Sequence, residues 1–323
     1  MRVSCVVESI PSYMGHMLSI ARVGFESEYS DRYSQSVKQE DINWLKENEE
    51  LLKWGNGKAG PLTGYGLFML GYVSPDGPEG IESYYNSLLA MAKSADVSQL
   101  FHSYPRLERL HEIWGPLDDP RAIEMLRALG GEIEQLKKVL IENWDCFITE
   151  VWPQEKPKVI AQANTINKRL QEMNLIENWE YATGFTFQSD SYEYVFSSGM
   201  ENAPRFNSLG YGRNWVYYDI PFLLEGIVHE IGSHLLMRLQ GELQREYDFS
   251  LLYKVYETLC SFLTKMIFSD LGIKSTPVDN SKLYVPRVEE LLKMEIQSIP
   301  ISDLRGIFRT VMDQIISEKG KGA

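Results

Sequence analysis

Two of the five histidines in this 323-residue chain lie five positions apart, at the ends of the segment His-Glu-Ile-Gly-Ser-His, residues 229–234. Neutral imidazoles are good ligands of Zn²⁺, and a glutamate beside a metal site can accept a proton from water. A short strand is expected just before this segment, at residues 215–218, and a helix through it. A strand followed by a helix with two histidines and a glutamate indicates a metal site built from His229, Glu230 and His234.

The five-residue spacing of the histidines differs from the more common spacing of four. On a regular helix, residues four apart lie about 40° apart around the axis, whereas residues five apart lie about 140° apart. A one-residue π-bulge would bring His229 and His234 to one face, and Gly232 makes that distortion easier. Without a bulge, Glu230 and His234 are the cofacial pair and could bind a metal together. A third interpretation needs no metal, because Glu230 and His234 can form a surface pair while His229 is hydrogen-bonded in the core.

A catalytic zinc site usually takes three protein ligands and leaves one position open. The next expected helix, residues 250–271, carries Glu257 beside its apolar stripe, where a polar side chain can reach a cleft at the edge of the core. Glu257 is therefore the candidate third ligand, and a solvated glutamate is the alternative. Glu242, Glu246 and Asp248 rank lower because they lie in or near the connecting loop.

The motif at residues 229–234, followed by Glu257 in the order Glu-Thr-Leu-Cys-Ser, resembles the HExxxH variant of the gluzincin zinc metallopeptidases. The microtubule-associated tyrosine carboxypeptidase family and its bacterial relatives carry a similar His-Glu-Ile-Gly-Thr-His stretch, with a later glutamate in a Glu-Gly-Leu-Ala context. The resemblance covers about residues 215–261. Thr258 and Cys260 stand where that family has glycine and alanine.

The resemblance implies a role for each residue of the motif. His229, His234 and Glu257 would bind Zn²⁺, and Glu230 would be the catalytic base. Zinc held by two imidazoles and one carboxylate lowers the pKa of its bound water towards 7 and polarises a carbonyl group. Glu230 would take a proton from that water and pass it to the leaving amine. The expected activity is zinc-dependent hydrolysis of a peptide bond in a peptide or protein substrate.

Candidate substrate-binding residues lie in and after the polar loop that precedes the expected strand. An exopeptidase that cuts at a C-terminus would bind the terminal carboxylate with an arginine, and Arg205 and Arg213 are candidates. Tyr217, with Tyr218 and Tyr211, is a candidate to stabilise the oxyanion. Each of these residues also fits an ordinary role, a surface arginine or a packing tyrosine.

Hydrophobic periodicity and turn residues predict the elements that would position this chemistry. Helices are expected at residues 41–54, 81–93, 120–147, 159–173, 220–240, 250–271, 285–296 and 301–318. Short aromatic or β-branched segments predict strands at residues 183–187, 192–196 and 215–218. The expected fold is α+β and mostly helical, with a zincin-like catalytic lobe that contains a small sheet and a helical N-terminal lobe.

Two prolines, Pro153 and Pro157, are expected to break the chain at residues 151–158. This break predicts a helical N-terminal lobe of unknown role at residues 1–150. The zincin-like metallopeptidase domain would then span residues 151–323.

Composition narrows the class of partner. The chain has 45 acidic and 32 basic residues and a net charge of −13, which argues against a nucleic acid or an anionic membrane as its main partner. Its three cysteines, Cys5, Cys146 and Cys260, are odd in number and far apart, as in a reducing compartment. The apolar run near the N-terminus is too short for a signal peptide, and no stretch reaches membrane-spanning length. We therefore expect a soluble, cytoplasmic protein; the oligomeric state does not follow from the sequence.

Two other classes of function compete with the peptidase. The first is a non-catalytic, zincin-like binding or regulatory protein, against which the presence of Glu230 argues. The second is a carboxylate-rich iron site in a helical bundle. That site would need Glu-x-x-His pairs on two helices, and the five histidines do not supply a second pair.

Overall fold

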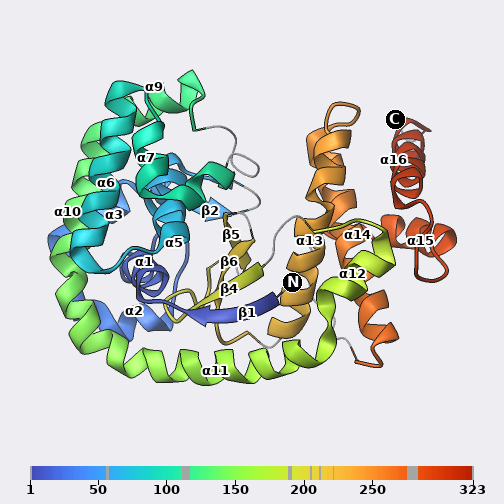
Figure 1. Ribbon diagram of the computed structural model, residues 1–323, viewed down its shortest axis with the longest axis horizontal. Coiled ribbons are helices and arrows are strands. Elements are labelled where there is room, and N and C mark those ends of the chain that lie inside the picture. The colour runs from blue at the N-terminus through green and yellow to red at the C-terminus, as the bar shows by residue number, and fades with distance from the viewer. Residues whose placement is uncertain are drawn as a thin grey trace. The chain divides into compact units, whose positions relative to one another are not determined.

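The computed structural model describes residues 2–55, 58–110, 117–187, 191–203, 206–210, 212–220, 222–274 and 283–321. It is mostly helical with a small mixed β-sheet, which confirms the expected α+β class at this level (Figure 1). The chain divides into two compact units. The N-terminal unit comprises Ser4–Asn167 and Glu193–Ile220, and the C-terminal unit comprises Met1–Val3, Lys168–Tyr192 and Pro221–Ala323.

Most helices of the N-terminal unit precede residue 150. They are α1 (Ser9–Ile20), α2 (Glu28–Tyr33), α3 (Gln39–Glu47), α4 (Glu49–Leu52), α5 (Met69–Val73), α6 (Gly77–Ser94), α7 (Ser98–Ser103), α9 (Pro120–Ala128) and α10 (Gly130–Cys146). Two segments, η2 (Leu62–Phe68) and η4 (Phe147–Val151), are π-helical. The expected helix at 120–147 is therefore two helices, which meet at Leu129 just before the flexible pair Gly130 and Gly131.

The prolines that were expected to break the chain lie inside a helix instead. Helix α11 (Trp152–Met173) follows η4 directly and contains both Pro153 and Pro157. Pro153 is the second residue of α11, next to a π-helical turn, where a missing backbone N–H costs little. The two units divide at Asn167, within α11, and residues 193–220 belong with the N-terminal unit.

Helices α12 (Leu175–Thr183), α13 (Leu223–Leu243), α14 (Phe249–Asp270), α15 (Pro286–Glu295) and α16 (Leu304–Lys321) belong to the C-terminal unit. The helices predicted at 220–240, 250–271, 285–296 and 301–318 agree with the last four of these within a few residues. The strand predicted at 183–187 is absent. Thr183 is the last residue of α12, and Gly184 ends this helix with a positive φ of 71°, a conformation that glycine adopts readily.

The main sheet has four strands in the order β1-β4-β6-β5, with β1 at Arg2–Val7, β4 at Ser191–Ser197, β5 at Phe206–Gly210 and β6 at Arg213–Tyr217. Strand β6 pairs in parallel with β4 and antiparallel with β5. Strands β4 and β6 confirm two of the predicted strands, whereas β1 and β5 were not predicted. A separate hairpin pairs β2 (Trp54–Gly55) with β3 (Lys58–Ala59).

The N-terminal unit contains a buried histidine with a structural role. His16 Nδ1 lies 3.0 Å from the hydroxyl of Tyr29, and its Nε2 lies 3.1 Å from the hydroxyl of Ser36. Burial lowers the pKa of His16 to about 3, so the ring is neutral and hydrogen-bonded in the core.

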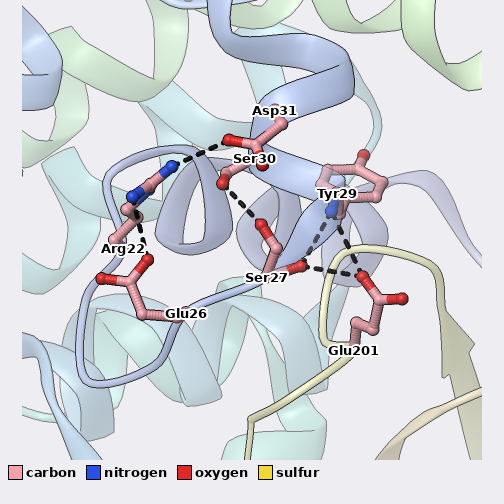
Figure 2. Close-up of polar contacts among 7 residues, drawn as sticks. All are labelled: Arg22, Glu26, Ser27, Tyr29, Ser30, Asp31 and Glu201. Carbon is pink, nitrogen blue, oxygen red and sulfur yellow. Dashed lines mark hydrogen bonds and ion pairs between the residues drawn. The ribbon is translucent and has the colours of Figure 1, made fainter.

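A carboxylate links the turn after β4 to the start of α2 (Figure 2). Glu201 Oε2 accepts hydrogen bonds from Ser27 Oγ at 3.1 Å and from the backbone N–H of Tyr29 at 3.2 Å. Ser27 Oγ also caps α2 by accepting from that same N–H. The contact joins segments 174 residues apart and satisfies donors that a helix start leaves open.

All three cysteines are free thiols. Cys5 and Cys260 are buried, and burial raises the pKa of both above the usual range of a thiol. Among the helices that the structure describes, none has the length and apolar character needed to cross a bilayer.

Candidate functional site

The residues of the predicted metal motif lie on α13 and α14, which run side by side in the C-terminal unit (Figure 1). Helix α14 begins at a cap in which Asp248 accepts a hydrogen bond from the backbone N–H of Leu251 at 3.0 Å. Helix α13 has buried apolar residues around most of its circumference, including Ile227, Ile231 and Leu235. Polar side chains on such a helix must find partners within the unit.

His229 and Glu257 meet between the two helices. His229 Nε2 lies 3.2 Å from Glu257 Oε2, although the residues are 28 positions apart in sequence. Their side chains are only 9% and 14% exposed. Burial lowers the pKa of His229, but the hydrogen bond and charge of Glu257, together with the charge of Glu230, outweigh it and leave this pKa raised. Glu257 is thus a buried partner of His229 and not a solvated glutamate.

Glu230 is a carboxyl group in an environment that disfavours its charge. Burial raises its pKa to about 7, the charge of Glu257 adds to that increase, and His229 opposes it. At neutral pH such a group is present in both protonation states and can therefore take up and release protons. Perturbed carboxyl groups of this kind are concentrated at functional sites.

His234 lies apart from the other two. Its Nδ1 is 3.2 Å from the hydroxyl of Tyr192, and the two rings meet edge to face with their centroids 5.0 Å apart. Helix α13 is regular from Leu223 to Leu243, so of the two helix conformations considered for the motif, bulged and regular, the regular one is present. His229 and His234 consequently point about 140° apart around the axis.

The geometry can be tested against a zinc ion. Zinc ligands lie about 2.0 to 2.2 Å from the metal, so two ligands at a tetrahedral angle are about 3.3 Å apart. The 3.2 Å between His229 Nε2 and Glu257 Oε2 fits two such ligands. His234 does not fit while α13 is regular. Accordingly, within the described residues, no three histidine, cysteine, aspartate or glutamate side chains group closely enough to hold a metal ion.

The structure adds residues to the site that sequence reasoning missed. Tyr253 donates a hydrogen bond to Glu257, and burial, with the charges of Glu257 and Glu230, raises the pKa of Tyr253 above its usual range. Cys260 lies on the same helix, with Ser233 and Tyr256 as hydrogen-bond partners. On α14, residues 253, 257 and 260 repeat at helical spacing, which is the only signal in the sequence that could have indicated them.

Arg213, the described arginine among the candidate substrate-binding residues, belongs to the N-terminal unit. Arg205 lies outside the described residues. Arg213 has a side chain that is 2% exposed, forms ion pairs with Glu8 and Glu193, and donates to the carbonyl of Tyr72 at 2.7 Å. Its guanidinium is therefore already paired within the N-terminal unit, and these contacts do not support the prediction that Arg213 binds a substrate carboxylate.

Tyr217 and Tyr218 are likewise part of the N-terminal unit. Tyr217 belongs to its hydrophobic core and is 8% exposed, with the ring of Tyr218 5.3 Å away. Burial raises the pKa of Tyr217 above its usual range. Tyr211 lies outside the described residues. The contacts of Tyr217 are those of a packing residue.

No known protein family, characterised protein or solved structure shows significant similarity to the chain. The resemblance of the segment 229–234 and Glu257 to the gluzincins therefore depends on those residues themselves and on their geometry.

Proposed function

We propose that the protein is a zinc-dependent peptidase whose site is formed by α13 and α14. The observation that supports this proposal most directly is the contact between His229 and Glu257. The motif predicted that a carboxylate on the following helix would lie beside His229. Glu257 lies there, and the distance between His229 Nε2 and Glu257 Oε2 suits two ligands of one zinc ion.

In this proposal His229, Glu257 and His234 hold the zinc, which requires His234 to leave Tyr192 and to join the other two ligands through a change in α13. The bound zinc would supply a Lewis acid for a carbonyl group and would lower the pKa of a water molecule. Glu230 would accept the proton of the attacking water and return it to the leaving amine. In the metal-free protein the pKa of Glu230 is raised to about 7, so its carboxyl group can take up and release a proton near neutral pH.

The surroundings of Glu230 support the same assignment. Glu230 is half-buried, and this burial is the main cause of its raised pKa, so charge interactions there are stronger than in open water. Tyr253 donates a hydrogen bond to Glu257, and a hydrogen bond of this kind would orient the carboxylate towards a metal. The substrate class, a peptide, is proposed from the resemblance of the motif.

The second candidate function is a zincin-like protein that binds a partner without catalysis. The regularity of α13 favours it, because an unbroken helix keeps His234 away from His229 and Glu257. In this alternative His229 and Glu257 form a buried polar pair that joins two helices, and no metal takes part.

Metal analysis and two substitutions test the proposal. Protein purified without chelators should contain one zinc per chain by mass spectrometry, and His234→Ala should lower that content sharply. Glu230→Gln keeps the shape of the side chain but cannot take a proton. It should retain zinc and reduce cleavage of a peptide library by about 10²- to 10⁴-fold.

Glu242→Gln is the matched control, since it makes the same change on α13 at a glutamate paired with Arg238 and Arg305 on the surface. It should leave both zinc content and cleavage unchanged. A parent protein with neither zinc nor cleavage would support the non-catalytic alternative. Loss of zinc in Glu230→Gln would show that Glu230 is a ligand and not the base.

A further inference from the structure

Polar side chains gather where the two parallel strands of the N-terminal unit end. Strands β4 and β6 pair up to Ser197 and Tyr217, and the backbone N–H of Tyr218 donates to the carbonyl of Ser197 at 3.1 Å. Glu201 follows β4 in the chain, whereas Tyr218 and Asp219 follow β6. The carboxyl ends of parallel strands are a common location of ligand sites. The residues at this end of the sheet therefore form a candidate binding site.

Helix α2 brings a cation to the same cluster. The guanidinium carbon of Arg32 lies 5.6 Å from the centroid of the Tyr29 ring, and the rings of Tyr29 and Tyr33 are 4.9 Å apart. Arg32 is exposed and forms no ion pair with any residue that the structure describes. The charge of Arg32 is therefore available to an anionic group of a ligand.

Glu201 supplies an anion to the cluster. Its Oε2 accepts hydrogen bonds from Ser27 Oγ and from the backbone N–H of Tyr29, and Figure 2 shows its second oxygen directed away from these donors. Among the described residues, no cation forms an ion pair with this half-buried carboxylate. The two hydrogen bonds orient the carboxylate of Glu201 but leave its charge without a counter-ion.

The charges of Arg32 and Glu201 act on the same two tyrosines. Burial raises the pKa of Tyr217, the charge of Glu201 raises it further, and the charge of Arg32 lowers it. Burial raises the pKa of Tyr218 as well, and the charges that act on it again include those of Arg32 and Glu201. Charge interactions fade beyond about 10 Å in salt solution. Arg32 and Glu201 therefore both lie near the rings of Tyr217 and Tyr218, although they do not pair with each other.

Two half-buried tyrosine rings, those of Tyr33 and Tyr218, supply apolar surface beside these charges. The hydroxyl of Tyr33 donates to Glu155 Oε1 at 2.7 Å, and Lys158 Nζ lies 2.8 Å from the same oxygen. Glu155 therefore has its own cation, and its contact holds the ring of Tyr33 in one orientation. A ring held in this way offers contact area to an apolar group at a low cost in conformational entropy.

We propose a binding site for a free α-amino acid with an apolar or aromatic side chain, formed by Arg32, Glu201, Tyr33 and Tyr218. At neutral pH such a ligand carries a carboxylate, which suits the guanidinium of Arg32, and an ammonium group, which suits Glu201. Its side chain suits the two tyrosine rings. The inference is independent of the proposed peptidase, because all four residues belong to the N-terminal unit.

Isothermal titration calorimetry with four related ligands tests the site. L-phenylalanine carries both charges, whereas N-acetyl-L-phenylalanine lacks the ammonium group and L-phenylalanine amide lacks the carboxylate. N-acetyl-L-phenylalanine amide lacks both charges. Each singly blocked ligand should bind about 10- to 100-fold more weakly than L-phenylalanine, which is the usual contribution of a hydrogen bond to a charged group. The doubly blocked ligand should bind most weakly.

Two substitutions assign the two charges of the ligand to their partners. Arg32→Gln should weaken binding of L-phenylalanine about 10- to 100-fold and leave binding of its amide nearly unchanged, because the amide has no carboxylate to lose. Glu201→Gln should weaken binding of L-phenylalanine by a similar factor and leave binding of N-acetyl-L-phenylalanine nearly unchanged. The matched controls are Arg22→Gln and Glu26→Gln, which break a 3.0 Å ion pair that Figure 2 shows in the same segment. Both controls should bind L-phenylalanine within about twofold of the parent.

The pattern across the four ligands separates recognition from a structural role. A variant that is only misfolded would weaken all four ligands alike, and that result would overturn the assignment of its charge. A parent protein that does not bind L-phenylalanine at millimolar concentration, or that binds all four ligands equally well, overturns the site itself. Because no step uses a metal or peptide cleavage, failure here leaves the proposed peptidase untouched.

Discussion

Glu230→Gln should stabilise the metal-free protein in a way that depends on pH. The pKa of Glu230 is about 7 in the folded protein, against an ordinary value of 4.5. The folded state therefore binds more protons than the unfolded state between these values, and stability falls as the pH rises through this window. The pKa of His229 is also raised, so its contribution to stability is likewise lost with rising pH. The second effect is smaller in the variant, because the charge of Glu230 contributes to the raised pKa of His229.

The size of the effect follows from the pKa values. One pKa unit corresponds to about 1.4 kcal/mol, so charging Glu230 costs about 3 kcal/mol at a pH well above 7. Glutamine has no charge and avoids this cost. When the pH is raised from 5 to 8.5, the unfolding free energy of the variant relative to that of the parent should increase by about 2 to 3 kcal/mol.

Urea unfolding of chelator-treated protein at the two pH values measures this difference. Glu242→Gln serves as the control, because its glutamate lies on the surface of α13 in ion pairs. Its stability relative to the parent should be nearly the same at both pH values. If Glu230→Gln differs from the parent by a constant amount at pH 5 and pH 8.5, Glu230 is not a carboxyl group held neutral by burial.

Two further predictions concern packing and charge. Gly232→Ala should lower the unfolding free energy by about 1 to 3 kcal/mol, because the added methyl group would overlap the ring of Trp179. Gly241→Ala on the same helix has open space beside it and should be neutral or stabilising by up to about 1 kcal/mol. Equal effects of the two substitutions in urea unfolding would contradict this packing. Arg213→Met should destabilise the protein by about 2 to 4 kcal/mol, because it leaves two partly buried carboxylates without their cation. A loss well under 1 kcal/mol would show that this cation is not needed in the core.

The sequence predicted the helices of the C-terminal unit well because their apolar residues recur at helical spacing and their ends carry clear signals. Strand β5 was assigned to a loop because Phe206–Gly210 contains Asn, Ser and Gly, which are uncommon in strands. The strand predicted at residues 183–187 is absent because helix α12 continues to Thr183 and ends at Gly184. The aromatic residues near Gly184 do not indicate that a helix precedes this glycine.

The residues of the site that follow from the spacing along a single helix could be predicted from the sequence. The spacing of residues 229–234 indicated His229 and Glu230, the position of Glu257 beside the apolar stripe of the next helix indicated that residue, and in the structure His229 contacts Glu257. The surroundings of His234 were not predictable, because they include Tyr192, which lies 42 residues earlier in the chain. The residues near α13 in the sequence do not indicate partners that lie so far away along the chain.

The division of the chain has a consequence for the order in which the protein is made. Residues 168–192 belong to the C-terminal unit, residues 193–220 return to the N-terminal unit, and the chain then crosses back. During synthesis, the N-terminal unit thus lacks three of its strands until about two thirds of the chain has left the ribosome. Since domains fold as units while the chain emerges, helix α12 must wait for α13 and α14 before it can pack. The contact between His229 and Glu257 therefore forms late in the synthesis of the chain.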